Sequence, residues 1–175
     1  MSRVVTWLQQ RENRMFCWVN QRIQHTSLDF FFTTITHLGG ASIAITTALC
    51  LALFGQGVWK TAGIYSCLAL ALSHIPVAII KRKYPRLRPY LVLPDTNTYK
   101  KPLKDHSFPS GHTTAIFSIV LPLVCVNFWI GAILLPLAVL VAISRIYLGL
   151  HYPSDCLAGA FIGTLSALSI VAFFG

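Results

Sequence analysis

Long runs of apolar residues alternate with short polar turns along most of the chain. A run of about 20 apolar residues, rising ~1.5 Å per residue, can cross the ~30 Å hydrocarbon core of a bilayer. Two such runs cover 29–54 and 58–80, and the last covers 155–174. Between them, the apolar stretch 111–150 is too long for one span and long enough for two short ones, with a turn at 127–131. The pattern predicts an all-α membrane bundle of about five transmembrane helices.

The first 27 residues follow a different pattern, in which apolar side chains recur near helical spacing with arginines between them. The apolar positions are Val4, Leu8, Met15, Val19 and Ile23. An apolar stripe combined with a basic face is typical of helices that lie in the membrane interface. We expect 1–27 to form such an amphipathic helix, with a break near Asn13. A poorly ordered basic tail is the alternative.

The range 81–109 is the longest polar segment, and it contains five prolines. Proline at that density favours extended and turn structure over helix, because its ring removes a backbone donor and clashes with the preceding turn. A loop of this length within a compact domain is usually functional. No internal repeat or domain boundary is visible, so 1–175 is expected to form a single domain with 81–109 as its active-site loop.

Composition favours an integral membrane protein. Hydrophobic residues make up 55% of the chain and charged residues 11%, with a mean hydropathy of +0.65, whereas soluble domains carry about 25% charged residues. The net charge of +9 comes mainly from two patches, because eight of the fourteen Lys and Arg residues lie in 81–104 and four in the first 22 residues. Nucleic acid is a poor partner for a chain that lies mostly in lipid. The bilayer's anionic headgroups or a phosphate-bearing substrate fit better.

An odd number of spans brings the polar clusters to one membrane face. The second span ends at Lys81, the third starts at 109–112 and the fourth ends at 145–151. Because successive spans reverse direction, these three points lie on the same side of the bilayer. From His106 onward the only formally charged residues are Arg145 and Asp155. Charges in or beside a bilayer are costly, so such residues indicate a functional site.

Eight residues on that face form a candidate anion-binding site: Lys81, Arg88, Ser110, Gly111, His112, Arg145, His151 and Asp155. Three fixed cations suit a multiply charged anion, and the planar fork of donors on arginine matches phosphate oxygens. Ser110 is a good N-cap residue for a following helix, and the free amides of Gly111 and His112 would add the positive end of the helix dipole. The predicted ligand is a phosphate group.

The two histidines favour phosphoryl transfer. One nitrogen of His151 can attack phosphorus while Asp155, four residues later, holds the other nitrogen as N–H. A helix that starts near Pro153, a favourable first helical position, would bring the carboxylate within reach. His112 can protonate the leaving oxygen and then activate water. The cations and helix amides would stabilise the charge that develops on the phosphate.

Three motifs formed by these residues resemble the signature motifs of the type-2 phosphatidic-acid phosphatase superfamily. They are KRKYPRLRP, with Lys81 and Arg88-Pro89; PSGH, from Pro109 to His112; and SRIYLGLHYPSD, with Ser144-Arg145, His151 and Asp155. All signature positions match in order, and the span pattern extends the resemblance over nearly the whole chain. The short chain is similar to small bacterial members of the undecaprenyl pyrophosphate phosphatase and phosphatidylglycerophosphatase type.

The resemblance implies a helical membrane enzyme that removes phosphate from lipids without a metal or other cofactor. In that family the histidine matching His151 becomes phosphorylated, the aspartate matching Asp155 orients it, and the histidine matching His112 is the acid. The phosphate-binding positions of the family match Lys81, Arg88, Ser110, Gly111 and Arg145. The expected substrate is undecaprenyl pyrophosphate, phosphatidylglycerophosphate or phosphatidic acid. The sequence distinguishes neither among these lipids nor among oligomeric states.

The distribution of basic residues and the family resemblance predict opposite orientations in the membrane. Cytoplasmic loops are usually the more basic ones, which would place 81–104 in the cytoplasm. The resemblance implies a multi-pass protein of the bacterial cell membrane whose site faces outward, with the loop charges retained for the substrate. We expect the outward orientation, which puts the C-terminus in the cytoplasm.

Other functions stay open at this point. The same residues would serve a phosphotransferase that passes the phosphoryl group to another lipid or sugar. A non-enzymatic lipid-phosphate-binding or channel-like membrane protein would need the cations but not a paired nucleophile and acid. A zinc hydrolase is least favoured, because His112, His151 and Asp155 could supply three ligands but three nearby cations would repel the metal.

Other polar residues near the motifs are interpreted as structural. The remaining basic residues of the loop suit a solvated, membrane-anchoring role: Arg82, Lys83, Arg86, Lys100, Lys101 and Lys104. Asp105 and His106 either line the entrance to the site or lie in a solvated loop. His74 is favoured as a packing residue, although its place near the end of the second span would let it approach the site.

Overall fold

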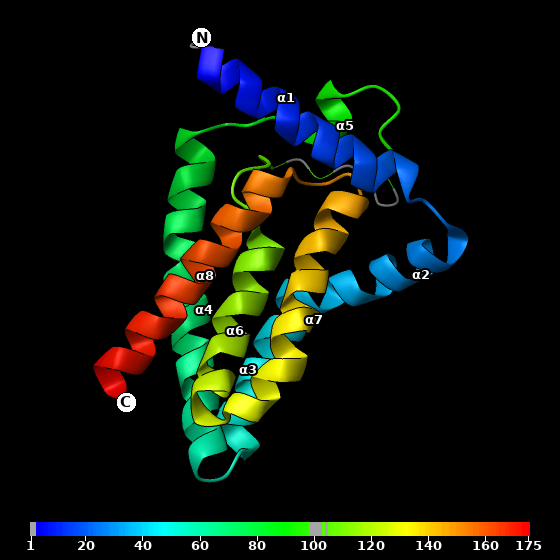
Figure 1. Cartoon of the computed structure of the whole chain (residues 1–175). Coiled ribbons are helices and arrows are strands. Elements are labelled where there is room, and N and C mark those ends of the chain that lie inside the picture. Colours follow the sequence, from blue (N-terminus) through cyan, green and yellow to red (C-terminus); the bar gives the residue numbers. More distant parts are fainter. Residues whose placement is uncertain (1–2, 99–102, 104) are drawn as a thin grey trace.

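A computed structural model describes residues 3–98, 103 and 105–175, which form an all-α bundle without strands (Figure 1). The helices are α1 (Arg3–Cys17), α2 (Thr26–Ile35), α3 (Ala41–Phe54), α4 (Val58–Lys83), α5 (Pro89–Val92), α6 (Gly111–Val126), α7 (Phe128–Tyr147) and α8 (Pro153–Phe174). A π-helical turn, Trp18–Arg22, follows α1, and a 3₁₀ turn, Thr36–Gly39, joins α2 to α3. The predicted fold class is confirmed.

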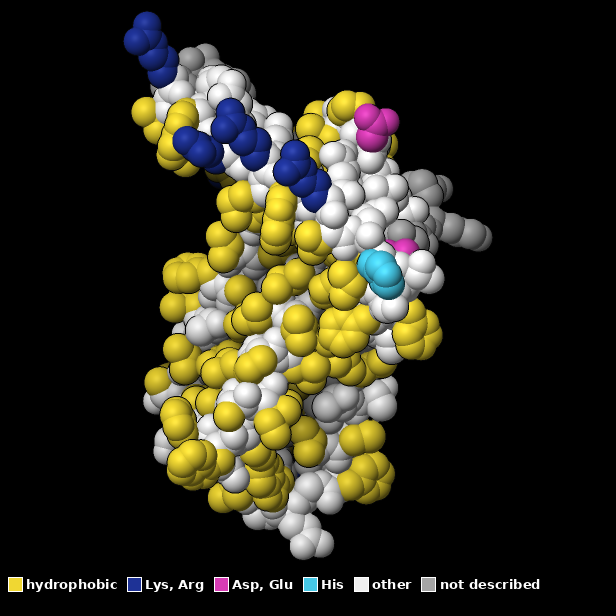
Figure 2. All heavy atoms as spheres, turned by 45° about the vertical axis from the view of Figure 1, so that its right-hand side comes forward, with side chains coloured by type: hydrophobic (Ala, Val, Ile, Leu, Met, Phe, Trp, Pro, Cys, Tyr) yellow, Lys and Arg dark blue, Asp and Glu magenta, His cyan; other side chains and the backbone are white. Residues whose placement is uncertain are grey.

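The helices of the bundle correspond to the predicted spans. Among the described residues, α4, α7 and α8 are each long and apolar enough to cross a membrane, and α2 and α3 qualify together as one bent segment. α6 has 16 residues, or about 24 Å at ~1.5 Å per residue. Apolar side chains cover the outside of the bundle in Figure 2, whereas the Lys and Arg side chains seen in that view gather at one end, along α1. These features are those of a multi-pass membrane protein.

The first predicted span is not straight, which corrects the expectation for 29–54. The segments Thr26–Gly39 and Ala41–Phe54 meet at 52°. Gly40 has extended backbone (φ −70°, ψ 147°), so the helical hydrogen-bond pattern stops there. A Cβ on Gly39 would lie 2.6 Å from the carbonyl oxygen of His112. Glycine at this position therefore lets the bend pack directly on the start of α6.

The N-terminal segment is one continuous helix through Asn13, so the predicted break there is wrong. Asparagine costs an α-helix only about 0.7 kcal/mol relative to alanine, and tertiary contacts outweigh that cost. Phe16 is fully buried with its ring centroid 5.7 Å from that of Tyr152. Asn20 is also fully buried and donates hydrogen bonds to the carbonyls of Asn97 and Tyr147. These contacts hold α1 across the end of the bundle (Figure 1).

Two glycines of α8 bring that helix against α6, as the small residues of the last span predicted. A Cβ on Gly159 would lie 2.6 Å from the carbonyl oxygen of Ser110, and one on Gly163 would lie 2.5 Å from that of Thr114. No larger residue fits without separating the helices. The close approach positions the first turns of α6 and α8 side by side.

The connections are shorter and more helical than predicted in two places. Asn127 alone separates α6 from α7, and its side chain accepts a hydrogen bond from the Trp129 amide at 3.1 Å, so Trp129 and Gly131 already belong to α7. α4 continues to Lys83, beyond the predicted end of its span. The described remainder of 84–109 consists of turns, extended backbone and the single helical turn α5, as the prolines indicated. Lys100, Lys101 and Lys104 lie outside the described residues.

Candidate active site

The residues selected from the sequence meet at one end of the bundle, the end crossed by α1 (Figure 1). Lys81 lies in the last turn of α4, Arg88 directly precedes α5, and Arg145 lies in the last turn of α7. Ser110 caps α6, and Asp155 lies in the first turn of α8. The Ser110 amide donates to the Asp155 carbonyl at 3.0 Å, which joins the two helix starts.

A tight turn after α7 presents His151 to this group. The amides of Leu150 and His151 both donate to the Arg145 carbonyl, at 3.0 and 3.2 Å. Gly149 within the turn has φ +73°, and a Cβ there would lie 2.6 Å from the Asn97 carbonyl oxygen. Only glycine adopts this backbone conformation readily and leaves room for the loop. The turn thus fixes the position of His151 relative to Arg145.

The carboxylate of Asp155 is fully buried and accepts hydrogen bonds on both oxygens. Oδ2 accepts from the Tyr152 amide at 2.8 Å and from the Ser107 hydroxyl, and Oδ1 accepts from Arg86 Nη1 at 2.7 Å. His151 Nδ1 lies 3.5 Å from Oδ2, close to it but not aligned as a hydrogen bond among the described residues. The Nδ1 side of the imidazole therefore faces the carboxylate, as the four-residue spacing predicted.

His151 is 2% exposed, and its pKa is lowered to about 4. Burial is the largest cause, because it disfavours the charged imidazolium, and the positive charges of Arg145 and Arg88 lower the pKa further. The nearby Asp155 carboxylate opposes the shift without reversing it. The imidazole is therefore neutral at neutral pH, and one of its nitrogens carries a lone pair.

Arg88 and Lys81 are held together by Asp105. Arg88 is 1% exposed; its Nη1 lies 3.2 Å from His151 Nε2, and its Nη2 donates to Asp105 Oδ1 at 2.7 Å. Lys81 Nζ donates to Asp105 Oδ2 at 2.5 Å and to the His106 carbonyl at 3.0 Å. Burial would raise the pKa of Asp105, but the two cations lower it to about 2. The carboxylate is thus a resident counter-ion for both cations.

Arg145 is buried without a carboxylate partner among the described residues. It is 2% exposed, its Nη1 donates to the Thr36 hydroxyl at 2.8 Å, and its Nε has no hydrogen-bond partner there. Burying a charge without a counter-charge costs on the order of several kcal/mol. An anion bound beside Arg145 would remove that cost, so the position is suited to a negatively charged ligand.

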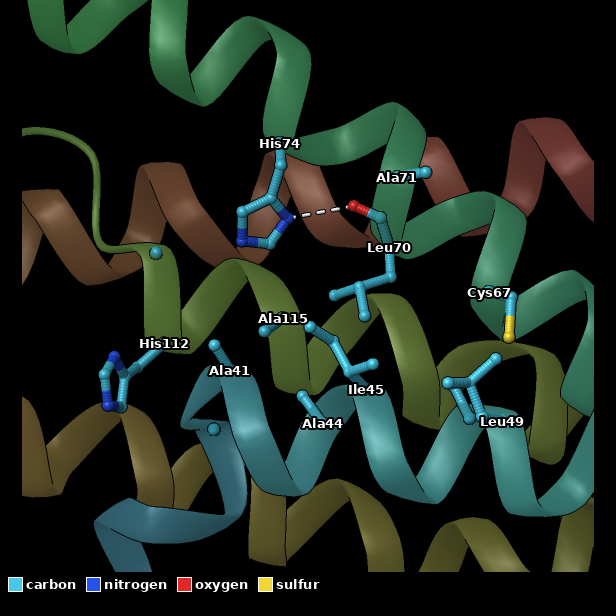
Figure 3. A pocket seen from close by; sticks show the side chains of 13 residues that line it. Ala41, Ala44, Ile45, Leu49, Cys67, Leu70, Ala71, His74, His112 and Ala115 are labelled. Atoms are coloured by element: carbon cyan, nitrogen blue, oxygen red, sulfur yellow. Dashed lines mark hydrogen bonds between the residues drawn. The ribbon is translucent and has the colours of Figure 1, made fainter.

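The start of α6 forms one end of an apolar cavity. Ser110 caps the helix through Thr113, and a Cβ on Gly111 would meet no atom within 4 Å, so the first helical turn borders open space. The cavity has a volume of about 520 Å³ and runs between α3, α4 and α6 (Figure 3). Gly111 and His112 line it together with alanine and leucine side chains of α3 and α4. A phosphate at the helix start would therefore adjoin a space for apolar groups.

His74 lines the same cavity from the α4 side, and its hydrogen bond lies within α4. Its Nδ1 lies 2.9 Å from the Leu70 carbonyl oxygen, which accepts the hydrogen bond (Figure 3). The Nδ1–H tautomer that this bond requires leaves Nε2 as an acceptor. His74 and His112 are thus the histidines that border the cavity among the described residues.

Sequence reasoning missed several partners of the site. Arg86 was interpreted as a solvated charge, but it pairs with Asp155 and with Glu12 of α1. Ser107 and Thr36 were not singled out, yet they bind Asp155 and Arg145. No local pattern marks these residues, because each contacts a partner more than 45 positions away. The described residues contain no group of three or more His, Cys, Asp or Glu that could hold a metal ion, so the zinc alternative lacks a ligand set there.

Comparisons with known proteins agree with this arrangement. The chain is 36% identical over 123 residues to a putative undecaprenyl-diphosphatase of Escherichia coli, a match that covers 70% of this chain and 62% of that protein. The chain spans only 53% to 62% of the length of three curated relatives, which are the Escherichia coli protein, a bacitracin transport permease protein of Bacillus licheniformis and an undecaprenyl-diphosphatase of Sulfolobus acidocaldarius.

Two solved structures share the fold over almost the whole chain. The crystal structure of Aquifex aeolicus LpxE matches with a TM-score of 0.82 and 32% identity, covering 91% of this chain and 93% of that one. A transmembrane phosphatidylglycerolphosphate phosphatase from Bacillus subtilis matches with a TM-score of 0.76 and 25% identity, covering 98% and 87%. The model of the PAP2 superfamily matches residues 62–175, which include all eight candidate site residues. The chain therefore belongs to the PAP2 superfamily.

Proposed function

We propose that the protein is a metal-independent lipid phosphatase that hydrolyses a phosphomonoester or pyrophosphate headgroup. The observation that carries the proposal is the neutral imidazole of His151 beside two buried arginines, one of which has no carboxylate partner among the described residues. Cations of this kind suit a phosphate, and a neutral imidazole is a nucleophile. The names and activities of the relatives support the same class of reaction.

The reaction begins with His151. Because Nδ1 faces Asp155, Nε2 carries the lone pair, which accepts a hydrogen bond from Arg88 Nη1 at 3.2 Å. When Arg88 turns this donor to the bound phosphate, the lone pair attacks the phosphorus atom. The bond between phosphorus and the lipid oxygen breaks as the bond from nitrogen to phosphorus forms, and His112 donates a proton to the leaving oxygen. His112 then takes a proton from water, which attacks the phosphohistidine. Phosphate leaves and His151 returns to its neutral form.

The remaining site residues bind the phosphate. Arg88, Lys81 and Arg145 are the cations. Most N–H donors of Arg88 are engaged by Asp105, Leu150 and His151, whereas Arg145 Nε has no hydrogen-bond partner among the described residues and is the most available donor. The amides at the start of α6, next to Ser110 and Gly111, add donors and the positive end of the helix dipole. Asp155 holds the imidazole in orientation and stabilises the positive charge that develops on it. These interactions strengthen as charge accumulates on the transferred group.

The apolar cavity supports a lipid substrate. It is bordered by His112 and Gly111 at one end and by Ala48, Leu49 and Cys67 farther along α3 and α4 (Figure 3). An acyl or prenyl chain placed there would leave its phosphate at the start of α6. Undecaprenyl pyrophosphate, phosphatidylglycerophosphate and phosphatidic acid all have this form. The relatives named above support the first two as candidates, and a turnover panel of the three lipids would rank them.

A variant of His151 tests the reaction. We expect His151→Ala to lower phosphate release from short-chain phosphatidic acid or prenyl pyrophosphate by at least about 1000-fold, because the nucleophile is lost. His25→Asn, at an exposed helix-capping histidine, is the matched control and should retain full activity. EDTA should leave turnover intact, and vanadate should inhibit it. Substantial turnover by His151→Ala protein would overturn the mechanism.

The same assay separates the alternatives. Labelled phosphate that appears on a lipid or sugar acceptor, rather than free in solution, identifies a phosphotransferase. Tight binding of the lipid phosphate without turnover identifies a binding protein. We expect free inorganic phosphate as the main labelled product.

A further inference from the structure

One acidic side chain connects the N-terminal helix to the candidate site. Glu12 is the only glutamate of the chain and the only acid before Asp29. Its side chain is 16% exposed; Oε2 accepts a hydrogen bond from Arg86 Nη2 at 2.7 Å, and Oε1 accepts one from the Ser154 amide at 3.0 Å. These contacts attach α1 both to the loop that carries Arg86 and to the first turn of α8.

Arg86 continues the connection to Asp155. Its Nη1 donates to Asp155 Oδ1 at 2.7 Å and to Ser154 Oγ at 2.8 Å, and its guanidinium carbon lies 4.0 Å from the centroid of the Tyr152 ring. Burial would lower the pKa of Arg86, but the carboxylates of Asp155 and Glu12 raise it above its ordinary value. Arg86 is thus a fixed charge between two carboxylates.

We propose that Arg86, held in place by Glu12, is a positioning residue for Asp155, and that α1 thereby helps to orient His151. The inference rests on the proposed function, because it concerns the efficiency of the same reaction. Arg86 binds Oδ1 of the carboxylate, while Oδ2 faces His151. Donors on both oxygens restrict the rotation of the buried carboxylate, and the orientation of the imidazole depends on that restriction.

The contacts of Arg86 also predict which kinetic constant it affects. Its described partners are Glu12, Ser154, Asp155 and the Tyr152 ring. The proposed phosphate ligands are other residues, so loss of Arg86 would leave the binding of the phosphate largely intact. The chemical step would slow, because a misplaced nucleophile reacts poorly even when the substrate is bound.

Phe16 packs the end of α1 on the bundle, and farther back along the helix the polar contacts of Glu12 hold it where an open space separates it from α8. A cavity of about 500 Å³ lies between α1 and the start of α8, with Leu8, Met15 and Leu157 in its walls and Arg86 at its border. Exposed apolar side chains of α1, Leu8 and Met15 among them, face this space, and arginines lie along the same helix (Figure 2), which suits the surface of an anionic bilayer. The bilayer would hold α1, and Glu12 would transmit the position of that helix to Asp155.

The test uses the full-length protein in bilayer discs that contain anionic lipid. We expect Arg86→Gln to lower kcat about 10- to 100-fold with little change in KM, since small misplacements of catalytic groups have effects of this size. Arg86→Lys should retain more activity than Arg86→Gln. Glu12→Gln should lose less activity than Arg86→Gln does. The kcat of the double variant should be no lower than that of Arg86→Gln alone, because both substitutions break the same connection between α1 and Asp155. Arg14→Gln and Arg82→Gln, at exposed arginines of α1 and of the last turn of α4, are the controls.

The outcomes separate this inference from the proposed function. Inactive wild-type protein would refute the proposed function and this inference with it. Active wild-type protein, inactive His151→Ala protein and an unaffected kcat in Arg86→Gln would overturn the inference alone. Losses in Glu12→Gln and Arg86→Gln that simply multiply in the double variant would also overturn it. Glu12→Gln changes only a partly exposed side chain, so its kcat tests the inference even where Arg86→Gln reduces folding: an unaffected kcat in folded Glu12→Gln protein would overturn the role of Glu12.

Discussion

At the residue scale, the site consists of buried cations that the protein neutralises only in part. Asp105 pairs with both Lys81 and Arg88, whereas Arg145 has only the hydroxyl of Thr36 among the described residues. Because Asp105 neutralises part of the positive charge, the site can stay folded without a ligand. The charge that is left over still attracts an anion. The same positive charges, together with burial, keep His151 neutral, so the residues that would bind phosphate also prepare the nucleophile.

The lowered pKa of His151 makes stability depend on pH. The pKa of a histidine in the unfolded chain is about 6.5, and in the folded protein it is about 4. Between these values the unfolded chain binds a proton that the folded protein does not, so the free energy of unfolding decreases as pH falls. The contribution is fully present above about pH 6.5 and is lost on acidification, by ~3 kcal/mol once the pH has passed through 4.

We therefore expect the melting temperature in detergent to fall between pH 6.5 and 4.5. His151→Gln should show a smaller fall, because it removes the group that must lose its proton on folding. His25→Asn is the control and should follow the wild-type curve. Asp105 contributes little in this range, because its carboxylate takes up a proton in the unfolded chain only near its ordinary pKa of about 3.9, and in the folded protein only near 2. Identical curves for His151→Gln and wild-type protein would contradict the assignment.

At the element scale, the bend between α2 and α3 serves the site as well as the fold. Its 3₁₀ turn supplies Thr36 to Arg145, and Gly39 lies against the carbonyl of His112. A straight span would present neither contact. Helix α1 has a comparable role, because Glu12 and Phe16 attach it to the residues around Asp155.

Replacing Gly39 tests the importance of the bend. We expect Gly39→Ala to destabilise the protein by about 1–3 kcal/mol, as overpacking in a tight contact does, and to lower phosphatase activity because the added Cβ displaces the start of α6. Ser42→Ala, on an exposed position three residues later, should change neither property. The measurements are the melting temperature and phosphate release. Wild-type stability and activity in Gly39→Ala would show that the backbone accommodates the methyl group easily.

At the scale of the whole molecule, the predicted spans place α1 and the site at one end and the C-terminus at the other (Figure 1). The hairpin at 55–57 lies at the same end as the turn between α6 and α7. If the site faces outward, as the family resemblance implies, both of these turns and the C-terminus face the cytoplasm.

Reporter fusions test this orientation. We expect a reporter after Gly175 to be active only in the cytoplasm, and one inserted at Asp95, in the exposed part of the active-site loop, to be active only outside. Phosphate release in each fusion checks that the protein is folded. An external C-terminus would show the opposite orientation, with the basic loop in the cytoplasm, as the distribution of Lys and Arg predicts. Two reporters on the same side would contradict the odd number of spans.

Much of the fold could be predicted because its causes are local. The length of an apolar run decides whether a helix spans the membrane, and an N-cap such as Ser110 or a proline in the first turn such as Pro153 marks where a helix begins. The convergence of the eight site residues followed from the parity of the spans alone. The proline content also predicted the irregular loop. None of these inferences needed the identity of a distant partner.

The sequence by itself thus determined the membrane class, the succession of helices and the residues that gather at one end. Only the tertiary structure decided that the first span bends at Gly39 and Gly40, that Asp105 pairs with two cations, and that Arg86 rather than another loop arginine binds Asp155. The physical reason is that these contacts join side chains from separate segments. Their partners depend on the path of the loops through space, which hydrophobic periodicity does not encode.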